Sequence, residues 1–496
     1  MKPGEAVKTS ASPVERRALF GTDGVRGVAN MEPMTPETVL RLGRAVGHYF
    51  RTASDRRHKI VIGKDTRLSG YMLETALASG LCSMGVDPLL VGPMPTPGIA
   101  FLTRSLRADA GVAISASHNS FEDNGIKFFG PDGFKLPDDA EATIEELMGG
   151  TEIDRLRPTA GGIGKAFRVD DAVGRYNEFL KNVVPKELTF DGLRIVVDTS
   201  HGAAYRIAPT VLQELGADVV AIGNQPDGLN INEGCGSLHT DVLCERVLRE
   251  GADLGIALDG DADRAILVDE LGEIVDGDRI LAILSLDLHA RGRLKKNTVV
   301  ATVMSNLGLE VALRERGIGM VRTAVGDRYV VERMRADGFN FGGEQSGHIV
   351  NLDSTTTGDG LITALSVVSL LVERGVSLST LRDCMTMYPQ RLINLRVRER
   401  RDLAGLPGVA DAIRAAETSL GDRGRVLVRY SGTELVARVM VEGETSDVVD
   451  LHAESIANAI RGVLGGDRPS QAATQAAKQS AKQAAPQVPT LDRLDR

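Results

Sequence analysis

A loop rich in small and polar residues directly follows a short apolar run at residues 112–114. The apolar run predicts a buried strand, and a loop at the end of a strand can hold reactive groups in a fixed place. The side chains offered there are Ser115, Ser117, His118, Asn119 and Lys127. A serine needs activation or an electrophilic partner to react. We interpret this loop as a phosphorylatable serine with electrostatic support. Taken alone, such a cluster is more often a turn or helix cap. A serine hydrolase is disfavoured because the chain has no G-x-S-x-G elbow.

Three carboxylates, Asp259, Asp261 and Asp263, alternate with small residues at 258–264. At this spacing they can turn toward one hard cation, and oxygen ligands of this kind suit Mg²⁺. An EF-hand is excluded because Arg264 stands where that loop requires glycine and because the flanks have the pattern of strands. A solvated acidic turn is the simpler alternative.

Two further loops carry groups that suit a sugar phosphate. The glycine-rich loop at 342–348 offers a carboxylate, an amide, a hydroxyl and an imidazole that can bind sugar hydroxyls, and its glycines allow close backbone approach. The segment 429–434, with Arg438 one strand later, combines a guanidinium, hydroxyls and backbone amides as a phosphate cradle does. Each has an alternative interpretation as a plain turn, and no nucleotide P-loop occurs.

Composition narrows the classes of protein. The chain has 496 residues, a net charge of -9, 42% hydrophobic residues, 4% aromatics and no Trp. Neither a basic stripe nor the stacking aromatics of nucleic-acid binders is evident. The four cysteines form no C-x-x-C pair, which argues against disulfides and structural zinc. The N-terminus lacks a signal-peptide core, and the longest apolar stretch, 361–372, is too short to span a bilayer. We expect a cytoplasmic protein with no nucleic-acid or membrane partner.

A unit of strand, loop, helix, glycine and strand recurs three times. The expected segments are 59–62, 70–84 and 88–91; 193–197, 203–215 and 219–222; and 298–303, 307–316 and 320–325. Gly85, Gly216 and Gly317 end the three helices, where a left-handed C-cap fits. Each unit predicts parallel strands joined by a right-handed crossover. The spacing favours real internal repetition, although accidental similarity of common βαβ units is the alternative.

The last part of the chain has a different pattern. Strands are expected at 425–430 and 436–441, followed by an amphipathic helix at 447–464. Its apolar residues near helical spacing are Val448, Leu451, Ile456, Ile460 and Val463. The sequence therefore predicts an α/β protein of four domains: three similar mixed α/β domains built on βαβ units and a smaller C-terminal α+β domain. The expected boundaries are 19–168, 169–272, 273–386 and 387–466, with a disordered tail at 467–496.

Together and in this order, the motifs resemble the α-D-phosphohexomutase superfamily from about residue 19 to residue 465. The segments 20–27, 325–330, 343–348 and 356–360 resemble the branch that acts on glucosamine phosphates. The resemblance implies four domains around one central cleft, Mg²⁺ as cofactor, and an isomerase that passes a phosphoryl group through a phosphoserine.

The resemblance also implies roles for individual residues. Ser117 matches the phosphorylated serine, which is a further metal ligand beside Asp259, Asp261 and Asp263. Lys127 is the leading candidate for the general acid/base. The other implied catalytic residues are His118, Arg264 and Arg26, and the implied substrate-binding residues are Glu344, Ser346, His348, Arg429, Ser431, Gly432, Thr433 and Arg438. His118 and His348 are the second candidates for proton transfer.

The implied reaction interconverts glucosamine 6-phosphate and glucosamine 1-phosphate, a step toward UDP-N-acetylglucosamine. Glucosamine 1,6-bisphosphate would be its intermediate and activator. A phosphoglucomutase/phosphomannomutase, or a non-catalytic sugar-phosphate-binding relative, is the alternative. We expect a small-molecule hexosamine phosphate as partner and a monomer or homodimer. The sequence leaves open the resting phosphorylation of Ser117, the proton-transfer residue, the role of the tail and regulation.

Overall fold

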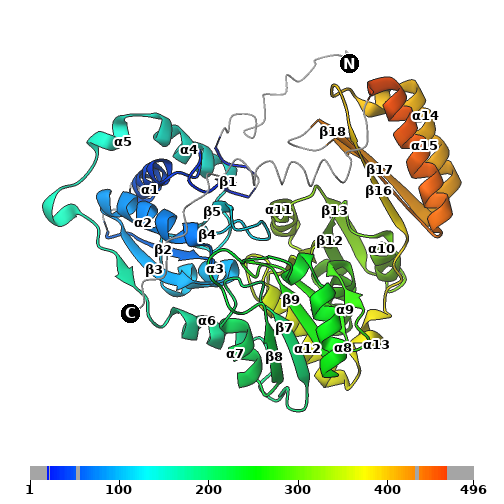
Figure 1. The fold of residues 1–496 in the computed structure, drawn as a ribbon, viewed down its shortest axis with the longest axis horizontal. Coiled ribbons are helices and arrows are strands. Elements are labelled where there is room, and N and C mark those ends of the chain that lie inside the picture. The colour runs from blue at the N-terminus through cyan, green and yellow to red at the C-terminus, as the bar shows by residue number, and fades with distance from the viewer. Residues whose placement is uncertain (1–18, 22, 52–55, 431–434, 466–496) are drawn as a thin grey trace, which may run out of the picture. The chain divides into compact units, whose positions relative to one another are not determined.

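The computed structural model describes residues 19–21, 23–51, 56–430 and 435–465, except for the side chain at position 404. The chain divides into two compact units, one formed by 1–305 with 309–385 and one by 306–308 with 386–496. The expected tail and the expected phosphate loop at 431–434 lie outside the described residues. Figure 1 shows the described elements along the chain.

The first sheet of the larger unit carries the serine loop. Its order is β1 (Val25–Val28), β5 (Asp123–Phe129), β4 (Ala110–Ile114), β2 (Lys59–Lys64), β3 (Asp87–Pro93) and β6 (Phe167–Arg168). Strand β2 pairs in parallel with β3 and β4, as the repeated unit predicts, whereas β5 is antiparallel to β4. The helices of this region are α1 (Pro36–Arg51), α2 (Leu68–Ser83), α3 (Thr96–Ser105), α4 (Asp138–Gly149) and α5 (Glu152–Arg155).

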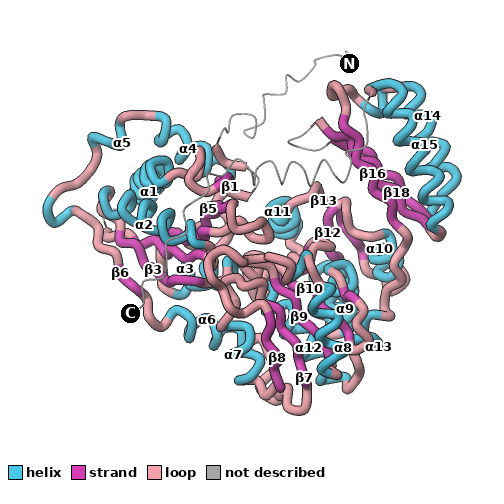
Figure 2. The backbone as a smooth tube through the Cα atoms, viewed as in Figure 1, coloured by secondary structure: helices cyan, strands magenta, loops and turns pink. Residues whose placement is uncertain are grey.

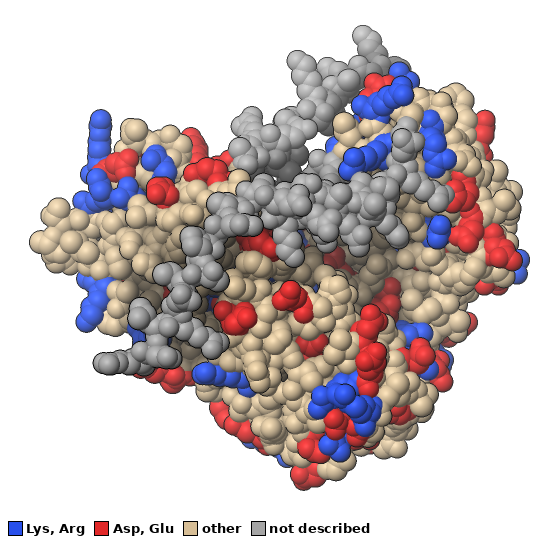
Figure 3. Space-filling view, viewed as in Figure 1, with Lys and Arg blue, Asp and Glu red and all other residues tan. Residues whose placement is uncertain are grey.

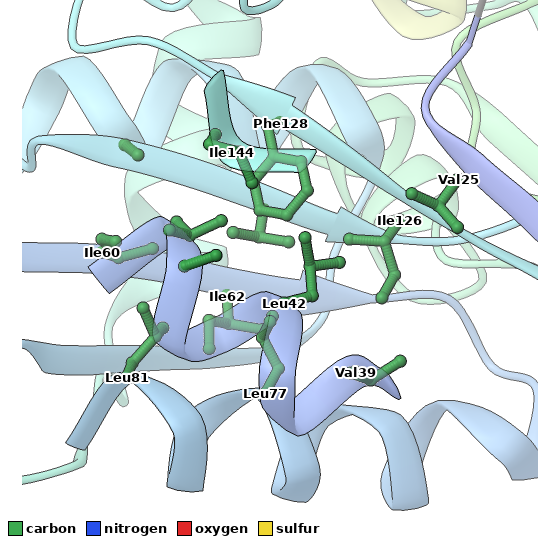
Figure 4. Packing of buried hydrophobic residues seen from close by; sticks show 14 of the residues in the cluster. Val25, Val39, Leu42, Ile60, Ile62, Leu77, Leu81, Ile126, Phe128 and Ile144 are labelled. Carbon is green, nitrogen blue, oxygen red and sulfur yellow. The ribbon is translucent and has the colours of Figure 1, made fainter. Parts of the chain in front are cut away.

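The core of this region lies between the first sheet and helices α1 and α2. Leu42 of α1 and Leu77 of α2 pack with Ile60 and Ile62 of β2, and all four are fully or almost fully buried (Figure 4). Alternate residues of β2 turn to the opposite face, where the Cβ of any side chain at Gly63 would overlap Ile99 of α3. Helices thus cover both faces, which fixes β4 as a central, immobile strand.

The second sheet carries the acidic loop. Its order is β11 (Ile274–Val275), β10 (Ala265–Asp269), β9 (Leu254–Leu258), β7 (Arg194–Asp198) and β8 (Asp218–Ile222). Strands β9 and β10 are antiparallel and fully buried, as the flanks of the acidic loop predict. The associated helices are α6 (Ala172–Lys181), α7 (Ile207–Glu214) and α8 (Asp241–Glu250).

The third sheet is smaller and carries the glycine-rich loop. Its order is β13 (Gly319–Thr323), β12 (Thr298–Thr302), β14 (Phe341–Gly343) and β15 (Ile349–Asn351). The loop joins the antiparallel strands β14 and β15. The helices of this part are α9 (Gly277–Ala290), α10 (Leu307–Arg314), α11 (Asp327–Asp337), α12 (Gly360–Arg374) and α13 (Leu378–Arg382).

The three predicted repeats are present as parallel strand pairs β2–β3, β7–β8 and β12–β13. Gly85, Gly216 and Gly317 have φ of 82°, 105° and 73°, the left-handed region that favours glycine at a helix end. One boundary was predicted wrongly: the second helix begins at residue 207 rather than 203. The residues before it form turns, because Gly202 packs against the backbone of Gly260 in the acidic loop.

The smaller unit is an antiparallel sheet of order β16 (Gln390–Arg396), β18 (Val436–Gly443) and β17 (Gly424–Tyr430). Helices α14 (Pro407–Leu420) and α15 (Ser446–Leu464) pack on one of its faces. The expected apolar face of α15 is partly wrong, since Val448, Leu451 and Val463 are exposed. Ile456 and Ile460 are buried as expected, and the small Ala453 and Ala457 complete the buried face.

None of the described helices is long and apolar enough to cross a membrane. On the face drawn in Figure 3, Lys and Arg are interspersed with Asp and Glu. Figure 2 shows, in pink, the loops that lie between the sheet containing β4 and the sheet containing β9. The serine loop and the acidic loop are among them.

Candidate functional site

Ser117 lies at the end of β4 and faces the acidic loop of the second sheet. It is buried, and its φ of 52° is in the left-handed region, which is unusual for a residue with a side chain. Its Oγ donates to Asp259 Oδ2 at 2.6 Å, and its N–H donates to Ser115 Oγ at 2.9 Å. His118 Nδ1 lies 3.4 Å from the same Oγ. The fold therefore brings the two loops singled out in the sequence into direct contact.

The three aspartates form one compact cluster. Asp259, Asp261 and Asp263 are buried, and one oxygen of each lies within 4.8 Å of the others. Thr96, at the start of α3, donates to Asp261 Oδ2 at 2.7 Å. Asp261 Oδ1 and Asp263 Oδ1 are buried and make no hydrogen bond to any described residue. Buried carboxylate oxygens with open coordination fit a hard divalent cation such as Mg²⁺.

The electrostatics of the cluster support the same fit. Burial raises the pKa of Asp259 well above its usual range, and the adjacent Asp263 and Asp261 raise it further. Burial would also raise the pKa of Asp263, but Lys127 and His348 hold it well below its usual range, so negative charge remains in the cluster for a divalent ion to neutralise. The donor set and its charge therefore suit a divalent metal ion better than a solvated acidic turn.

Lys127 is a buried cation next to the cluster. From β5, its Nζ lies 3.2 Å from Asp261 Oδ2, 3.5 Å from Asp263 Oδ2 and 3.4 Å from Asp23 Oδ2. Burial alone would lower the pKa of Lys127, but these three carboxylates raise it above its usual range. A lysine that serves as a base near neutral pH needs a lowered pKa. In this arrangement Lys127 is an ammonium ion that is held by three carboxylates.

The pKa of His118 shifts in the opposite direction, to a value below its usual one. Burial and, to a lesser extent, the guanidinium groups of Arg264 and Arg26 lower the pKa of His118 to about 4. Its imidazole is therefore neutral near pH 7. A neutral imidazole close to a serine hydroxyl can accept a proton.

A second group of charges surrounds Asp23 in the loop before β1. Asp23 pairs with Arg26, and its Oδ1 lies 2.5 Å from Lys135 Nζ. Lys135 Nζ also lies 2.7 Å from Asp327 Oδ2 at the start of α11. Burial opposes ionisation of Asp23, but Lys127, Lys135 and Arg26 hold its pKa well below the usual range. A partly buried network of alternating charges thus links the loop before β1 to the start of α11.

The glycine-rich loop completes the site from the third sheet. Glu344 Oε1 accepts from Gly326 N–H at 3.0 Å, and Ser346 Oγ lies 3.5 Å from Glu344 Oε2. His348 is buried, with Nδ1 at 3.6 Å from Asp263 Oδ1. The Gly358 N–H lies 3.1 Å from His348 Nε2, and although burial lowers the pKa of His348, the carboxylates of Asp263 and Asp327 raise it to about 9.

The structure brings most of the sequence-predicted residues to one place. The residues gathered in the larger unit are Arg26, Ser117, His118, Lys127, Asp259, Asp261, Asp263, Arg264, Glu344, Ser346 and His348. In the smaller unit, Arg429 and Arg438 lie directly opposite each other on β17 and β18. Burial lowers the pKa of Arg429, and Arg438 lowers it further. Ser431, Gly432 and Thr433 lie outside the described residues.

Sequence reasoning missed Asp23, Lys135, Asp327 and Thr96. Asp23 and Asp327 lie in the segments 20–27 and 325–330 that carry the resemblance, so their carboxylates were a signal that could have been used. Thr96 and Lys135 stand in no recognisable pattern. Their importance comes from contacts with Asp261 and Asp327, which are 165 and 192 residues away.

Comparisons with known proteins agree with the geometry. Four family models match: "Phosphoglucomutase/phosphomannomutase, alpha/beta/alpha domain I" at 17–153, domain II at 174–272, domain III at 276–388 and the C-terminal domain at 392–459. The phosphoglucosamine mutase of Syntrophotalea carbinolica is 59% identical over 450 residues, 91% of this chain and 98% of that protein. That of Anaeromyxobacter dehalogenans is 60% identical over 457 residues, 90% of this chain and 100% of that protein.

Solved structures show the same fold. A phosphoglucomutase/phosphomannomutase family protein from Burkholderia thailandensis has a TM-score of 0.76 at 24% identity, covering 90% of this chain and 98% of the other. An Aspergillus fumigatus N-acetylphosphoglucosamine mutase, solved with GlcNAc-6P and magnesium, has a TM-score of 0.61 at 18% identity, covering 91% and 97%. With three α/β/α domains and a C-terminal domain all matched, the chain belongs to the phosphoglucomutase/phosphomannomutase family of phosphohexomutases, among which the curated relatives reported above are phosphoglucosamine mutases.

Proposed function

We propose that this protein is a phosphoglucosamine mutase that interconverts glucosamine 6-phosphate and glucosamine 1-phosphate through phosphorylated Ser117. The observation that carries the proposal is the 2.6 Å hydrogen bond from Ser117 Oγ to Asp259, one of three clustered buried carboxylates. Phosphoryl transfer requires mainly alignment and neutralisation of charge. A buried serine beside a cation-binding cluster and several fixed cations meets both needs.

The residues expected to hold Mg²⁺ are Asp259, Asp261, Asp263 and an oxygen of phosphorylated Ser117. Bound there, the ion would neutralise charge on the transferring phosphoryl group. Arg264 is half-buried beside Asp263, with its Nε 3.7 Å from Asp263 Oδ1, and would add a guanidinium to the same charge. Arg26, held by Asp23, would do so from the opposite loop.

The sugar and the second phosphate would be held by other loops. Glu344, Ser346 and His348 would bind the hydroxyls and amine of the hexosamine. The distal phosphate would be bound in the smaller unit, where two arginines are held opposite each other despite their repulsion. The residues proposed for that phosphate are Arg429, Ser431, Gly432, Thr433 and Arg438.

In the proposed cycle, phosphorylated Ser117 gives its phosphoryl group to glucosamine 6-phosphate and forms glucosamine 1,6-bisphosphate. The bisphosphate reverses its orientation and returns the 6-phosphoryl group to Ser117. Lys127 remains the leading candidate for the general acid/base. His118 and His348 remain the second candidates, and the neutral imidazole of His118 suits the acceptor step.

The test is a pair of serine variants in the same loop. Ser117→Ala should abolish conversion of glucosamine 6-phosphate, while Ser120→Ala, which removes an exposed hydroxyl, should retain it. Peptide mass spectrometry after incubation with glucosamine 1,6-bisphosphate should find one phosphate on Ser117. Near-normal turnover by Ser117→Ala, or a phosphate on another residue, would refute the proposal.

Comparison of kcat/KM for glucosamine, glucose and mannose 6-phosphates decides the substrate. A preference for glucose or mannose 6-phosphate would assign the protein to phosphoglucomutase/phosphomannomutase activity instead. The domain boundaries 19–168, 169–272, 273–386 and 387–466, the cytoplasmic location and the monomeric or dimeric state stay predictions from the sequence.

A further inference from the structure

Two backbone carbonyl groups of the serine loop share the same two hydrogen-bond donors. The carbonyl oxygens of Ser117 and Asn119 each accept hydrogen bonds from the same two side-chain nitrogens, Arg67 Nη2 and Asn232 Nδ2. The distances from Arg67 are 3.2 and 2.6 Å, and those from Asn232 are both 2.9 Å. We call these two side chains the carbonyl clamp. Each nitrogen has two hydrogens, so each can donate to both oxygens.

The carbonyl clamp binds a residue whose backbone conformation is unfavourable. Ser117 has a φ of 52°, which costs free energy for a residue with a Cβ unless surrounding contacts hold it. Rotation of Ser117 toward an ordinary conformation would turn its carbonyl away from both donors and move Oγ away from Asp259. The four hydrogen bonds therefore hold the orientation in which Oγ meets the acidic cluster.

Arg67 is a rigid half of the clamp. It is fully buried, and Asp65 accepts from both its backbone N–H and its guanidinium. Asp65 N–H in turn donates to the carbonyl of Ile114 at the end of β4. Arg67 thus lies in the loop between β2 and α2, beside the serine loop, and its neighbours Thr66 and Leu68 donate to the carbonyls of His201 and Gly228.

Asn232 is the half that comes from the second sheet. It lies between β8 and α8, and its backbone N–H donates to the carbonyl of Ser200 at 2.9 Å. A Cβ at Gly260 would lie 2.6 Å from the Ser117 carbonyl oxygen and 2.9 Å from Asn232 Nδ2. The backbone between Asp259 and Asp261 is therefore packed against the carbonyl clamp. Asn232 thus contacts both the serine loop and the acidic loop.

We propose that Asn232 is a positioning residue that registers the serine loop against the acidic loop and so sets the alignment of Ser117 for phosphoryl transfer. The inference rests on the proposed function, since it concerns the same serine. Asn232 donates to carbonyl oxygens only, and it is assigned no contact with substrate. Its effect should therefore fall on the rate of transfer rather than on binding of the sugar phosphate.

The magnitude follows from alignment. A displacement of about 1 Å in a reacting group costs about 10²-fold in rate. Loss of two of the four hydrogen bonds, with Arg67 retained, should lower kcat by about 10- to 100-fold. KM should change by less than about threefold, because the groups that bind the sugar and its distal phosphate lie on other loops.

The test uses Asn232→Asp and Asn232→Ala in the full chain, with Asn230→Ala as the matched control. Asp is nearly the same size as Asn but presents an oxygen in place of the donor nitrogen, so packing is kept while the hydrogen bonds are lost. Asn230 lies in the same loop but bonds only to residues 225 and 227 of that loop. Thermal unfolding first checks that all variants are folded.

The decisive readout is the single-turnover rate at which Ser117 takes phosphate from glucosamine 1,6-bisphosphate, with steady-state kcat and KM beside it. We expect a 10- to 100-fold lower rate in both Asn232 variants and a wild-type rate in Asn230→Ala. Equal rates for Asn232→Asp and Asn230→Ala would overturn the inference, as would a loss confined to KM. A wild-type protein that takes no phosphate would refute the proposed function itself, which is a different result.

Discussion

The hydrogen bond between Tyr176 and Asp359 links α6 to the first turn of α12 and can be tested by pH. The Tyr176 hydroxyl donates to Asp359 Oδ2 at 2.7 Å, and both side chains are buried. Asp359 also caps α12, because it accepts from the N–H groups of Leu361 and Ile362 at 3.0 Å. Burial raises the pKa of Asp359, and the charge of Asp263 adds to the rise. The three donors lower the pKa, and the net value is about 6.

The sign of the pH effect follows from this rise. Because the pKa of Asp359 is higher in the folded protein than its ordinary 3.8, its contribution to stability is full below about pH 3.8 and is lost as the pH rises through about 6. The rise corresponds to about 3 kcal/mol, at about 1.36 kcal/mol per pKa unit. Above pH 6 the buried carboxylate is ionised and depends on its donors most.

Tyr176→Phe removes one of the three donors. A hydrogen bond to a charged group contributes about 1.5–3 kcal/mol, and one between neutral groups about 0.5–1.5 kcal/mol. We therefore expect the variant to lose about 1.5–3 kcal/mol at pH 8, where Asp359 is ionised, and about 1 kcal/mol at pH 5, where it is mostly protonated.

The assay is thermal unfolding at pH 5 and pH 8 of wild type, Tyr176→Phe and the control Tyr71→Phe. Tyr71 is 55% exposed, so its variant measures the loss of a solvated hydroxyl. Other groups that titrate in this range act alike in all three proteins. The reasoning is refuted if Tyr176→Phe lowers the midpoint equally at both pH values, or more at pH 5.

Two further predictions concern an ion pair between α11 and α4 in the larger unit and the proposed metal ion. Arg328 binds the buried Glu141 through two nitrogens, at 3.2 and 2.9 Å. Arg328→Met should therefore destabilise the protein by about 3–5 kcal/mol, because it leaves a buried carboxylate without this partner. Adding Glu141→Leu should restore most of that stability. A double variant as unstable as the single one in thermal unfolding would contradict this prediction. Chelation by EDTA should abolish mutase activity and Mg²⁺ should restore it, with Asp261→Asn needing about tenfold or more Mg²⁺ because one open carboxylate oxygen is lost. Full activity in EDTA would show that the acidic cluster has another role.

Much of the local structure could be predicted because neighbouring residues decide it. The buried run at 112–114 forms β4, and the strands around the three aspartates form β9 and β10. Gly85, Gly216 and Gly317 end helices because only glycine adopts a left-handed φ without a steric cost. The residue types of the acidic loop favoured a metal site, whereas the role expected for Ser117 came from the resemblance to the superfamily.

The errors arose where distant parts of the chain decide the outcome. Helix α7 begins late because Gly202 packs on Gly260, and that contact joins residues 58 positions apart. In α15 the buried face runs through Ala453 and Ala457 rather than Leu451, because the sheet beneath leaves room for small side chains. A hydrophobic residue at helical spacing does not identify the face that a sheet covers.

By itself, the sequence determined which groups are available: a serine in a strand-end loop, three alternating carboxylates, a glycine-rich loop and an arginine-rich hairpin. The packing of the sheets, by contrast, surrounds the Lys127 ammonium with three carboxylates from two other loops, and these raise its pKa although burial alone would lower it. It alone also placed Asn232 beneath Ser117. Charge state and alignment depend on distances between side chains, and those distances are set by how whole sheets pack, which no local pattern records.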